Sequence, residues 1–247
     1  MTNVLTTLGN QPWRAATGRP TYAASLLGRR DVAVLFDFNG VLIDDEPIHF
    51  QAFRRVLAAD GHLLRPEDYR RYLGLDDRGT FLTLLTEQGA DIDAELLDDW
   101  IATKQRLYAE LTQDGVHLFP GARELIVALD RAGVALAIVS GARRAEIERA
   151  LETAGLAACF SVVIAADSVA RPKPDPEGYR AAFDLLAARF PRVTTGVAIE
   201  DAPAGIHAAR AAGLACIGVT TSCTPHELRG ADRVVDSLRQ LRLVEAT

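Results

Sequence analysis

The stretch that decides the fold runs from Leu35 to Asp45 and reads LFDFNGVLIDD. The apolar run 32–36 leads into it and has the length and composition of a buried strand, which ends abruptly at Asp37. Asn39 and Gly40 follow and indicate a turn. In open α/β sheets the chemistry lies at the carboxyl ends of parallel strands, so Asp37 stands where a reactive group is expected.

The rest of the chain first shows helical spacing and then an alternation of apolar runs and helices. Between residues 46 and 115 only the helical pattern is present, as in Phe50, Phe53, Val56 and Leu57. From residue 116 onward the alternation predicts right-handed βαβ units and a doubly wound parallel sheet, an α/β fold. We expect further strands near 134–139, 161–165, 196–199, 214–219 and 233–235, and helices near 121–132, 144–155, 177–189 and 203–212.

This pattern divides the chain into three parts. Residues 31–45 and 116–247 form the predicted α/β core, and residues 46–115 form a helical insert that is placed to cover the sheet edge as a movable cap domain. Residues 1–30 hold four Arg and no acid, a composition that loosely ordered arms and organelle transit peptides share. We expect a poorly ordered N-terminal arm there.

The composition argues against several classes of partner. A formal net charge of −6 does not favour nucleic acid or an anionic membrane surface, because both recruit excess Lys and Arg. The three cysteines form no CxxC pair and predict neither a disulfide framework nor a zinc site. The chain contains no apolar run of about 18 residues and no signal-peptide core. We therefore expect a cytoplasmic protein, and the sequence gives no prediction of oligomeric state.

Lysine is rare in this chain. Only two of the 27 basic residues are Lys, Lys104 and Lys173. Where Arg is so strongly preferred, a Lys raises the question of whether a compact ammonium group is needed at that position. For Lys104, chance remains the alternative.

Polar side chains suited to phosphoryl transfer follow the predicted strands. They are Asp37, Ser140 with Gly141, Lys173, and Glu200 with Asp201. Because the carboxyl ends of parallel strands meet at one edge of a sheet, we expect these groups in one crevice. A carboxylate nucleophile, a hydroxyl, a lysine and carboxylates that can bind Mg²⁺ are what attack on a phosphate monoester needs. Ser140 and Asp201 are also placed to cap the helices that follow them.

Four segments resemble the haloacid dehalogenase superfamily, in the subgroup that has a helical cap after the first strand. They read DFNGV from Asp37, VSGA around Ser140, RPKPDP around Lys173 and EDAPAGIHAARAAG from Glu200. The resemblance extends over nearly the whole chain except the N-terminal arm. It implies a Rossmann-like core with an inserted cap, and a Mg²⁺-dependent phosphatase of a small phosphorylated metabolite such as a sugar phosphate.

The resemblance also implies a role for each matched residue. Asp37 would be the nucleophile that becomes an aspartyl-phosphate, while Ser140, Gly141 and Lys173 would hold the phosphate oxygens. The Mg²⁺ ligands would be Asp37, the backbone carbonyl of Asn39, Asp201 and, directly or as a partner of a ligand, Glu200.

Position 39 departs from the family pattern, which has an acid there that protonates the leaving oxygen. An amide neither gives up nor takes a proton near neutral pH, although the carbonyl of Asn39 can still bind a metal. A positioned acid or base typically contributes roughly 10²–10⁴ in rate. His49 is the candidate replacement, because DDEPIH resembles the cap hinge of this subgroup; the alternative is a structural histidine on a helix face.

Asn39 is also compatible with alternatives to a natural phosphatase. An introduced substitution would trap a phosphoenzyme, and a natural one fits a low-turnover pseudoenzyme that binds a phosphorylated ligand. A β-phosphoglucomutase-like phosphomutase is a further alternative, but Glu110 stands where the mutase resemblance implies a Lys two residues after Tyr108. We therefore favour hydrolysis, and in the insert we expect Arg78 to contact substrate.

Overall fold

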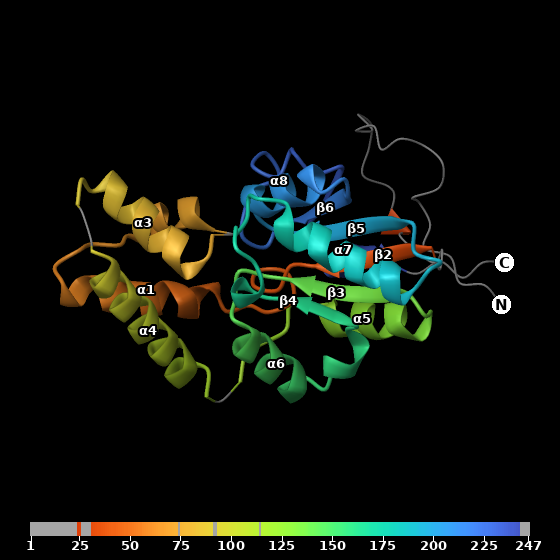
Figure 1. Ribbon diagram of the computed structural model, residues 1–247, viewed down its shortest axis with the longest axis horizontal. Coiled ribbons are helices and arrows are strands. Elements are labelled where there is room, and N and C mark those ends of the chain that lie inside the picture. The colour runs from red at the N-terminus through yellow and green to blue at the C-terminus, as the bar shows by residue number, and fades with distance from the viewer. Residues whose placement is uncertain (1–23, 26–30, 74, 91–92, 114, 243–247) are drawn as a thin grey trace.

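The structure, a computed structural model, confirms the predicted α/β class (Figure 1). It describes residues 24–25, 31–73, 75–90, 93–113 and 115–242. A six-stranded sheet in which every pairing is parallel has the order β4-β3-β2-β5-β6-β7. Its strands in chain order are β2 (Val32–Phe36), β3 (Ala135–Val139), β4 (Val162–Ile164), β5 (Thr195–Glu200), β6 (Ala215–Val219) and β7 (Arg233–Val235).

The predicted N-terminal arm lies outside the described residues, except for one short strand. This strand, β1 (Ala24–Ser25), pairs in parallel with β8 (Leu241–Arg242). The two make a separate small sheet.

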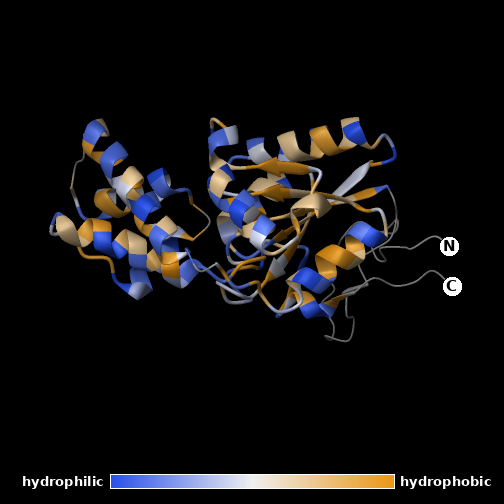
Figure 2. Cartoon of the chain, turned by 90° about the horizontal axis from the view of Figure 1, so that it is seen from below, coloured by the Kyte–Doolittle hydropathy of each residue, from blue (hydrophilic) through white to orange (hydrophobic). Residues whose placement is uncertain are grey.

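Helices cover both faces of the main sheet, which explains why its strands are mainly apolar. Alternate residues of β2 point to opposite faces: Val34 and Phe36 belong to one buried cluster, and Ala33 and Leu35 to the other. The first cluster includes buried residues of α5 (Ala122–Arg131) and α6 (Arg144–Thr153), and the second those of α7 (Glu177–Arg189) and α8 (Pro203–Ala211). Figure 2 shows apolar colour over most of the strands and alternating colours along the helices.

The register of the central strands brings their carboxyl ends to one level. Phe36, the last residue of β2, pairs with Ile138 of β3 and Ile199 of β5. The residues that follow these three strands therefore emerge together at one edge of the sheet. This is the edge that the helical insert faces (Figure 1).

The helical insert lies between β2 and α5 and has its own core. It contains α1 (Glu46–Ala59), α2 (Pro66–Tyr69), the 3₁₀ turn η1 (Arg70–Tyr72), α3 (Asp77–Glu87) and α4 (Ala94–Leu111). Phe53, Phe81 and Trp100 pack as aromatic neighbours in this core, with ring centroids 4.9 and 5.4 Å apart in the two contacts. Within the described part of the chain, we find no helix with the length and apolar character needed to cross a membrane.

Candidate active site

The carboxyl ends of β2, β3 and β5 place polar side chains in one buried region. Asp37 follows β2 and Ser140 follows β3. Glu200 is the last residue of β5, and Asp201 follows it. These four residues are buried, although burial normally excludes ionisable groups that lack partners. The strand ends thus converge as the sequence predicts.

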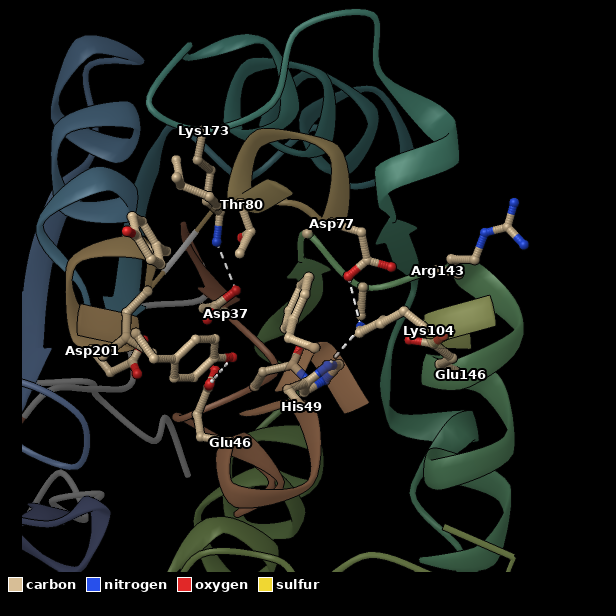
Figure 3. Close-up of a pocket in the computed structure, with 18 residues that line it drawn as sticks. Asp37, Glu46, His49, Asp77, Thr80, Lys104, Arg143, Glu146, Lys173 and Asp201 are labelled. Carbon is tan, nitrogen blue, oxygen red and sulfur yellow. Dashed lines mark hydrogen bonds and ion pairs between the residues drawn. The ribbon is translucent and has the colours of Figure 1, made fainter. Parts of the chain in front are cut away.

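Lys173 joins this group from the loop between β4 and α7. Its ammonium nitrogen lies 2.6 Å from Oδ1 of Asp37 and 2.7 Å from Oε1 of Glu200. Lys173 is itself 9% exposed, and its ammonium lies 5.3 Å from the ring centroid of Tyr179. The buried lysine thus neutralises part of the charge on two carboxylates, a contact visible beside Asp37 in Figure 3.

The charges of this group are strongly coupled. Burial raises the pKa of Asp37 to about 7, although the ammonium of Lys173 acts in the opposite direction. Burial and the negative charges of Asp37 and Glu200 raise the pKa of Asp201 well above its ordinary value. Burial opposes the charge of Lys173, but the two carboxylates outweigh it and raise the pKa of the lysine. The site therefore holds more carboxyl groups than its one lysine can keep ionised.

Tyr179 was not predicted from the sequence, and it fixes Glu200. Its hydroxyl donates to Oε1 of Glu200 at 2.5 Å, the same oxygen that accepts from Lys173. Gly205 makes room for this carboxylate, because a Cβ at that position would lie 2.0 Å from Oε1. Glu200 is thus bonded to Tyr179 of α7 and lies against Gly205 of α8, and its Oε1 contacts the ammonium of Lys173.

Gly40 allows the turn after β2 to approach the carboxylate of Asp201. Its φ of +75° lies in the left-handed region, and a Cβ there would come within 1.9 Å of Oδ2 of Asp201. A larger residue at position 40 would displace the carboxylate.

Three carboxylates form the group best suited to a cation. Oxygen atoms of Asp37, Glu200 and Asp201 lie within 4.8 Å of one another. Hard oxygen donors suit Mg²⁺. A divalent cation would stabilise the ionised form of these carboxyl groups, which one lysine does not balance. The donor set therefore fits the predicted metal.

Ser140 and Gly141 start the loop after β3. The hydroxyl of Ser140 accepts a bond from the backbone N–H of Ala142 at 3.0 Å and donates to Oδ1 of Asn39 at 3.3 Å. A Cβ on Gly141 would contact the backbone oxygen of Leu75 in the insert at 3.6 Å. This loop thus lies where the core and the insert meet.

Position 39 belongs to a second hydrogen-bonded group, next to the first. The amide nitrogen of Asn39 donates to Oδ2 of Asp45 at 2.8 Å and lies 3.0 Å from Nε2 of His49. His49 is stacked on Tyr108, with centroids 4.3 Å apart. Tyr108 in turn donates through its hydroxyl to Oδ2 of Asp45. The predicted proximity of His49 and Asn39 is therefore observed.

Lys104 continues this second group into the insert. Its ammonium lies 2.7 Å from Nδ1 of His49 and 2.6 Å from Oδ1 of Asp77, and its side chain is 1% exposed (Figure 3). Burial and the charge of Lys104 disfavour protonated His49, but Asp45 and Glu46 outweigh them and raise the pKa of the histidine. Both lysines of the chain are thus buried in ion pairs at the site.

The insert closes one side of a pocket over these residues. Core residues Asp37, Lys173 and Asp201 line it together with side chains of the insert, which include Glu46, Phe53, Tyr69, Asp77, Thr80 and Lys104. The Tyr69 hydroxyl donates to Glu46 at 2.8 Å. Arg143 borders the pocket from the core, with its guanidinium turned away from the other labelled side chains in Figure 3.

Arg78 does not occupy the position expected of it. It is not among the residues that line this pocket, and its half-exposed guanidinium pairs with Asp98 of α4. The reason is the phase of α3: Asp77, Thr80 and Phe81 face inward, and Arg78 lies about 100° around the helix from Asp77. Asp77 and Thr80 are the residues of α3 that reach the pocket.

Comparison with known proteins gives consistent matches. A family model described as haloacid dehalogenase-like hydrolase matches residues 34–219. The chain is 31% identical to validoxylamine A 7'-phosphate phosphatase of Streptomyces hygroscopicus subsp. limoneus, over 84% of this chain and 94% of the relative. It is 30% identical to phosphorylated carbohydrates phosphatase of Thermotoga maritima, over 74% and 82% of the two chains. The crystal structure of CbbY from Rhodobacter sphaeroides in complex with phosphate superposes with a TM-score of 0.73 at 31% identity, over 84% of this chain and 94% of CbbY.

Proposed function

This chain belongs to the haloacid dehalogenase-like hydrolase family, and we propose that it hydrolyses a sugar phosphate through an aspartyl-phosphate on Asp37. Its relatives place it among phosphatases of small phosphorylated metabolites. The observation that carries the proposal is the carboxylate of Asp37, which lies at the end of a central strand with an ammonium 2.6 Å away and two further carboxylates beside it. The sugar phosphate is favoured because relatives are named for phosphorylated carbohydrates and for validoxylamine A 7'-phosphate.

In this proposal Asp37 attacks phosphorus as the bond to the sugar oxygen breaks, and water later cleaves the aspartyl-phosphate. Lys173, the hydroxyl of Ser140 and the backbone at Gly141 bind the phosphate oxygens. Lys173 also reduces the repulsion between the carboxylate of Asp37 and an anionic substrate, since its ammonium contacts that carboxylate directly.

Magnesium would be held by Asp37, Asp201 and the backbone carbonyl of Asn39. When bound, it would supply positive charge that neutralises the transferring phosphoryl group. We assign Glu200 to the support of Lys173, because its Oε1 already accepts from Lys173 and Tyr179.

We assign the proton transfer to His49. It lines the pocket and lies 3.0 Å from the side chain that replaces the expected acid. Its second nitrogen is held by Lys104, which fixes the orientation of the ring. The helical insert would act as the movable cap that closes the pocket over substrate, with residues 46–115 as its extent.

The test is phosphate release from a panel of sugar phosphates, measured with Mg²⁺ and with EDTA. We expect release only with Mg²⁺, and loss of release in Asp37→Asn. Asp44→Asn provides the matched control, because Asp44 carries the same side chain on an exposed position in the same segment. Full activity in Asp37→Asn would exclude the proposed nucleophile.

A low-turnover phospho-ligand-binding protein is the second candidate, and Asn39 is the feature that favours it. Intact mass after incubation with acetyl phosphate separates the two. A phosphatase returns to the unmodified mass once acetyl phosphate is removed, whereas a protein that lacks an effective proton carrier keeps the added phosphoryl group on Asp37.

A further inference from the structure

The side chain of Asp45 has no role in the proposed reaction, yet it is fully buried beside position 39. Asp45 directly precedes α1, where an Asp side chain commonly accepts a backbone N–H bond and caps the helix. Here it makes no such bond. Its carboxylate is directed instead at Asn39, His49 and Tyr108.

These contacts use only one oxygen of the carboxylate. Oδ2 accepts from the amide of Asn39 at 2.8 Å and from the hydroxyl of Tyr108, and Nε2 of His49 lies 3.2 Å away. Oδ1 is buried and has no hydrogen-bond partner among the described residues. A buried oxygen without a partner costs free energy. The orientation of the carboxylate is therefore set by the three partners of Oδ2.

The direction of each bond follows from its neighbours. Lys104 can only donate, so neutral His49 accepts through Nδ1 and carries on Nε2 the hydrogen that points toward Asp45. The amide of Asn39 must present nitrogen to Asp45, because the reversed amide would bring two acceptor oxygens to 2.8 Å. The oxygen of Asn39 is then left to accept from Ser140 at 3.3 Å.

We propose that Asn39 and Asp45 are a matched donor–acceptor pair, in which Asp45 is a positioning residue that requires a hydrogen-bond donor at position 39. Through Asn39 it orients the hydroxyl of Ser140, the group that the proposed function assigns to phosphate. A carboxylate at position 39 would bring a second acceptor to within 2.8 Å of the buried carboxylate of Asp45, with no donor between them. The amide is therefore required by the carboxylate at position 45.

The test exchanges the two side chains. Asn39→Asp alone places two carboxylates in contact, and we expect it to lower Tm by at least about 4 °C without raising kcat. In the double variant Asn39→Asp with Asp45→Asn, the amide at position 45 donates to the acid at position 39. His49 can donate to the same acid, since it lies 3.0 Å from that side chain. We expect the double variant to recover the lost Tm and to exceed Asn39→Asp in kcat by at least about tenfold, with a smaller change in KM.

The proposal is overturned if Asn39→Asp is as stable as the parent protein, or if the two substitutions change Tm additively. If Asn39→Asp does not fold, the comparison is between the double variant and Asp45→Asn, and the pairing requires the double variant to have the higher Tm. Asp44→Asn is the control and should match the parent protein. A failure of the proposed function would appear separately, as activity that survives Asp37→Asn, because the Tm comparison does not depend on turnover.

Discussion

Lys173 is the single positive charge within contact of Asp37, the proposed nucleophile, among the described residues, and its removal should be costly. Its ammonium is bonded to Asp37 and Glu200 at 2.6 and 2.7 Å, and the side chain is 9% exposed. The change to test is Lys173→Met, which keeps the length of the side chain and removes the charge. Asp37, Glu200 and Asp201 are then left buried together without a cation.

The expected loss follows from the burial of these groups. Removing one partner of a buried ion pair costs about 3–5 kcal/mol. For a chain of this size each kcal/mol lowers Tm by about 2–4 °C, so the predicted decrease is roughly 6–20 °C in the absence of metal. Mg²⁺ should return part of it, because a ligand at 100 times its Kd stabilises by about 2.7 kcal/mol.

The assay is thermal unfolding followed by circular dichroism, in EDTA and in saturating Mg²⁺. Arg171→Met is the matched control, since Arg171 lies in the same loop but makes exposed ion pairs with Asp175 and Glu177. It should change Tm little in either buffer. A Lys173→Met protein with an unchanged Tm in EDTA, or with a deficit that Mg²⁺ does not reduce, would refute the charge balance described for the site.

Three further variants test other parts of the site. The pKa of His49 is raised in the folded protein, so protonation of His49 stabilises the fold. This stabilisation is complete below the ordinary pKa of 6.5 and is lost as the pH rises through the folded pKa. His49→Gln should therefore lower Tm more in acid than in alkali. Gly40→Ala should weaken Mg²⁺ binding, measured by calorimetry, because its Cβ would displace Asp201. Gly205→Ala should lower kcat in the phosphate-release assay, because its Cβ would displace Glu200 from Lys173.

The core of the fold was predictable because its strands are buried on both faces. Continuous apolar runs such as 32–36 and 135–139 carry that information in the sequence itself. The same strands end in polar residues, so the meeting of Asp37, Ser140 and Asp201 was predictable as well. Parallel pairing fixes which ends lie together.

The partners of these residues could not be predicted in the same way. Tyr179 reaches Glu200 across 21 residues of sequence, and Asp45 reaches Tyr108 across 63. No local pattern specifies such contacts. Asp45 also precedes a helix, a position that by itself indicates a cap, yet its side chain bonds to Asn39 and Tyr108 instead.

Arg78 could not be placed by the pattern of its helix. Phe81, Leu84 and Leu85 define the buried face of α3. Asp77 and Arg78 precede Phe81 by four and by three residues, and both spacings lie on the same side of a helix. In the structure Asp77 lines the pocket, whereas Arg78 pairs with Asp98.

The burial of both lysines answers the question raised by their rarity. Each compact ammonium touches two partners on a buried side chain, Lys173 at Asp37 and Glu200, and Lys104 at His49 and Asp77. A guanidinium would need more room and more acceptors.

The chain enters the helical insert next to Asp45 and leaves it shortly after Tyr108, and the two residues are bonded to each other. Both ends of the insert therefore meet at one carboxylate, which also bonds to Asn39 and, through it, to Ser140. A rotation of the insert, as proposed for the cap, would alter this junction and the hydroxyl beyond it. By thermodynamic linkage, a phosphate bound at that hydroxyl would then favour one position of the insert, and that position would in turn set the affinity for phosphate.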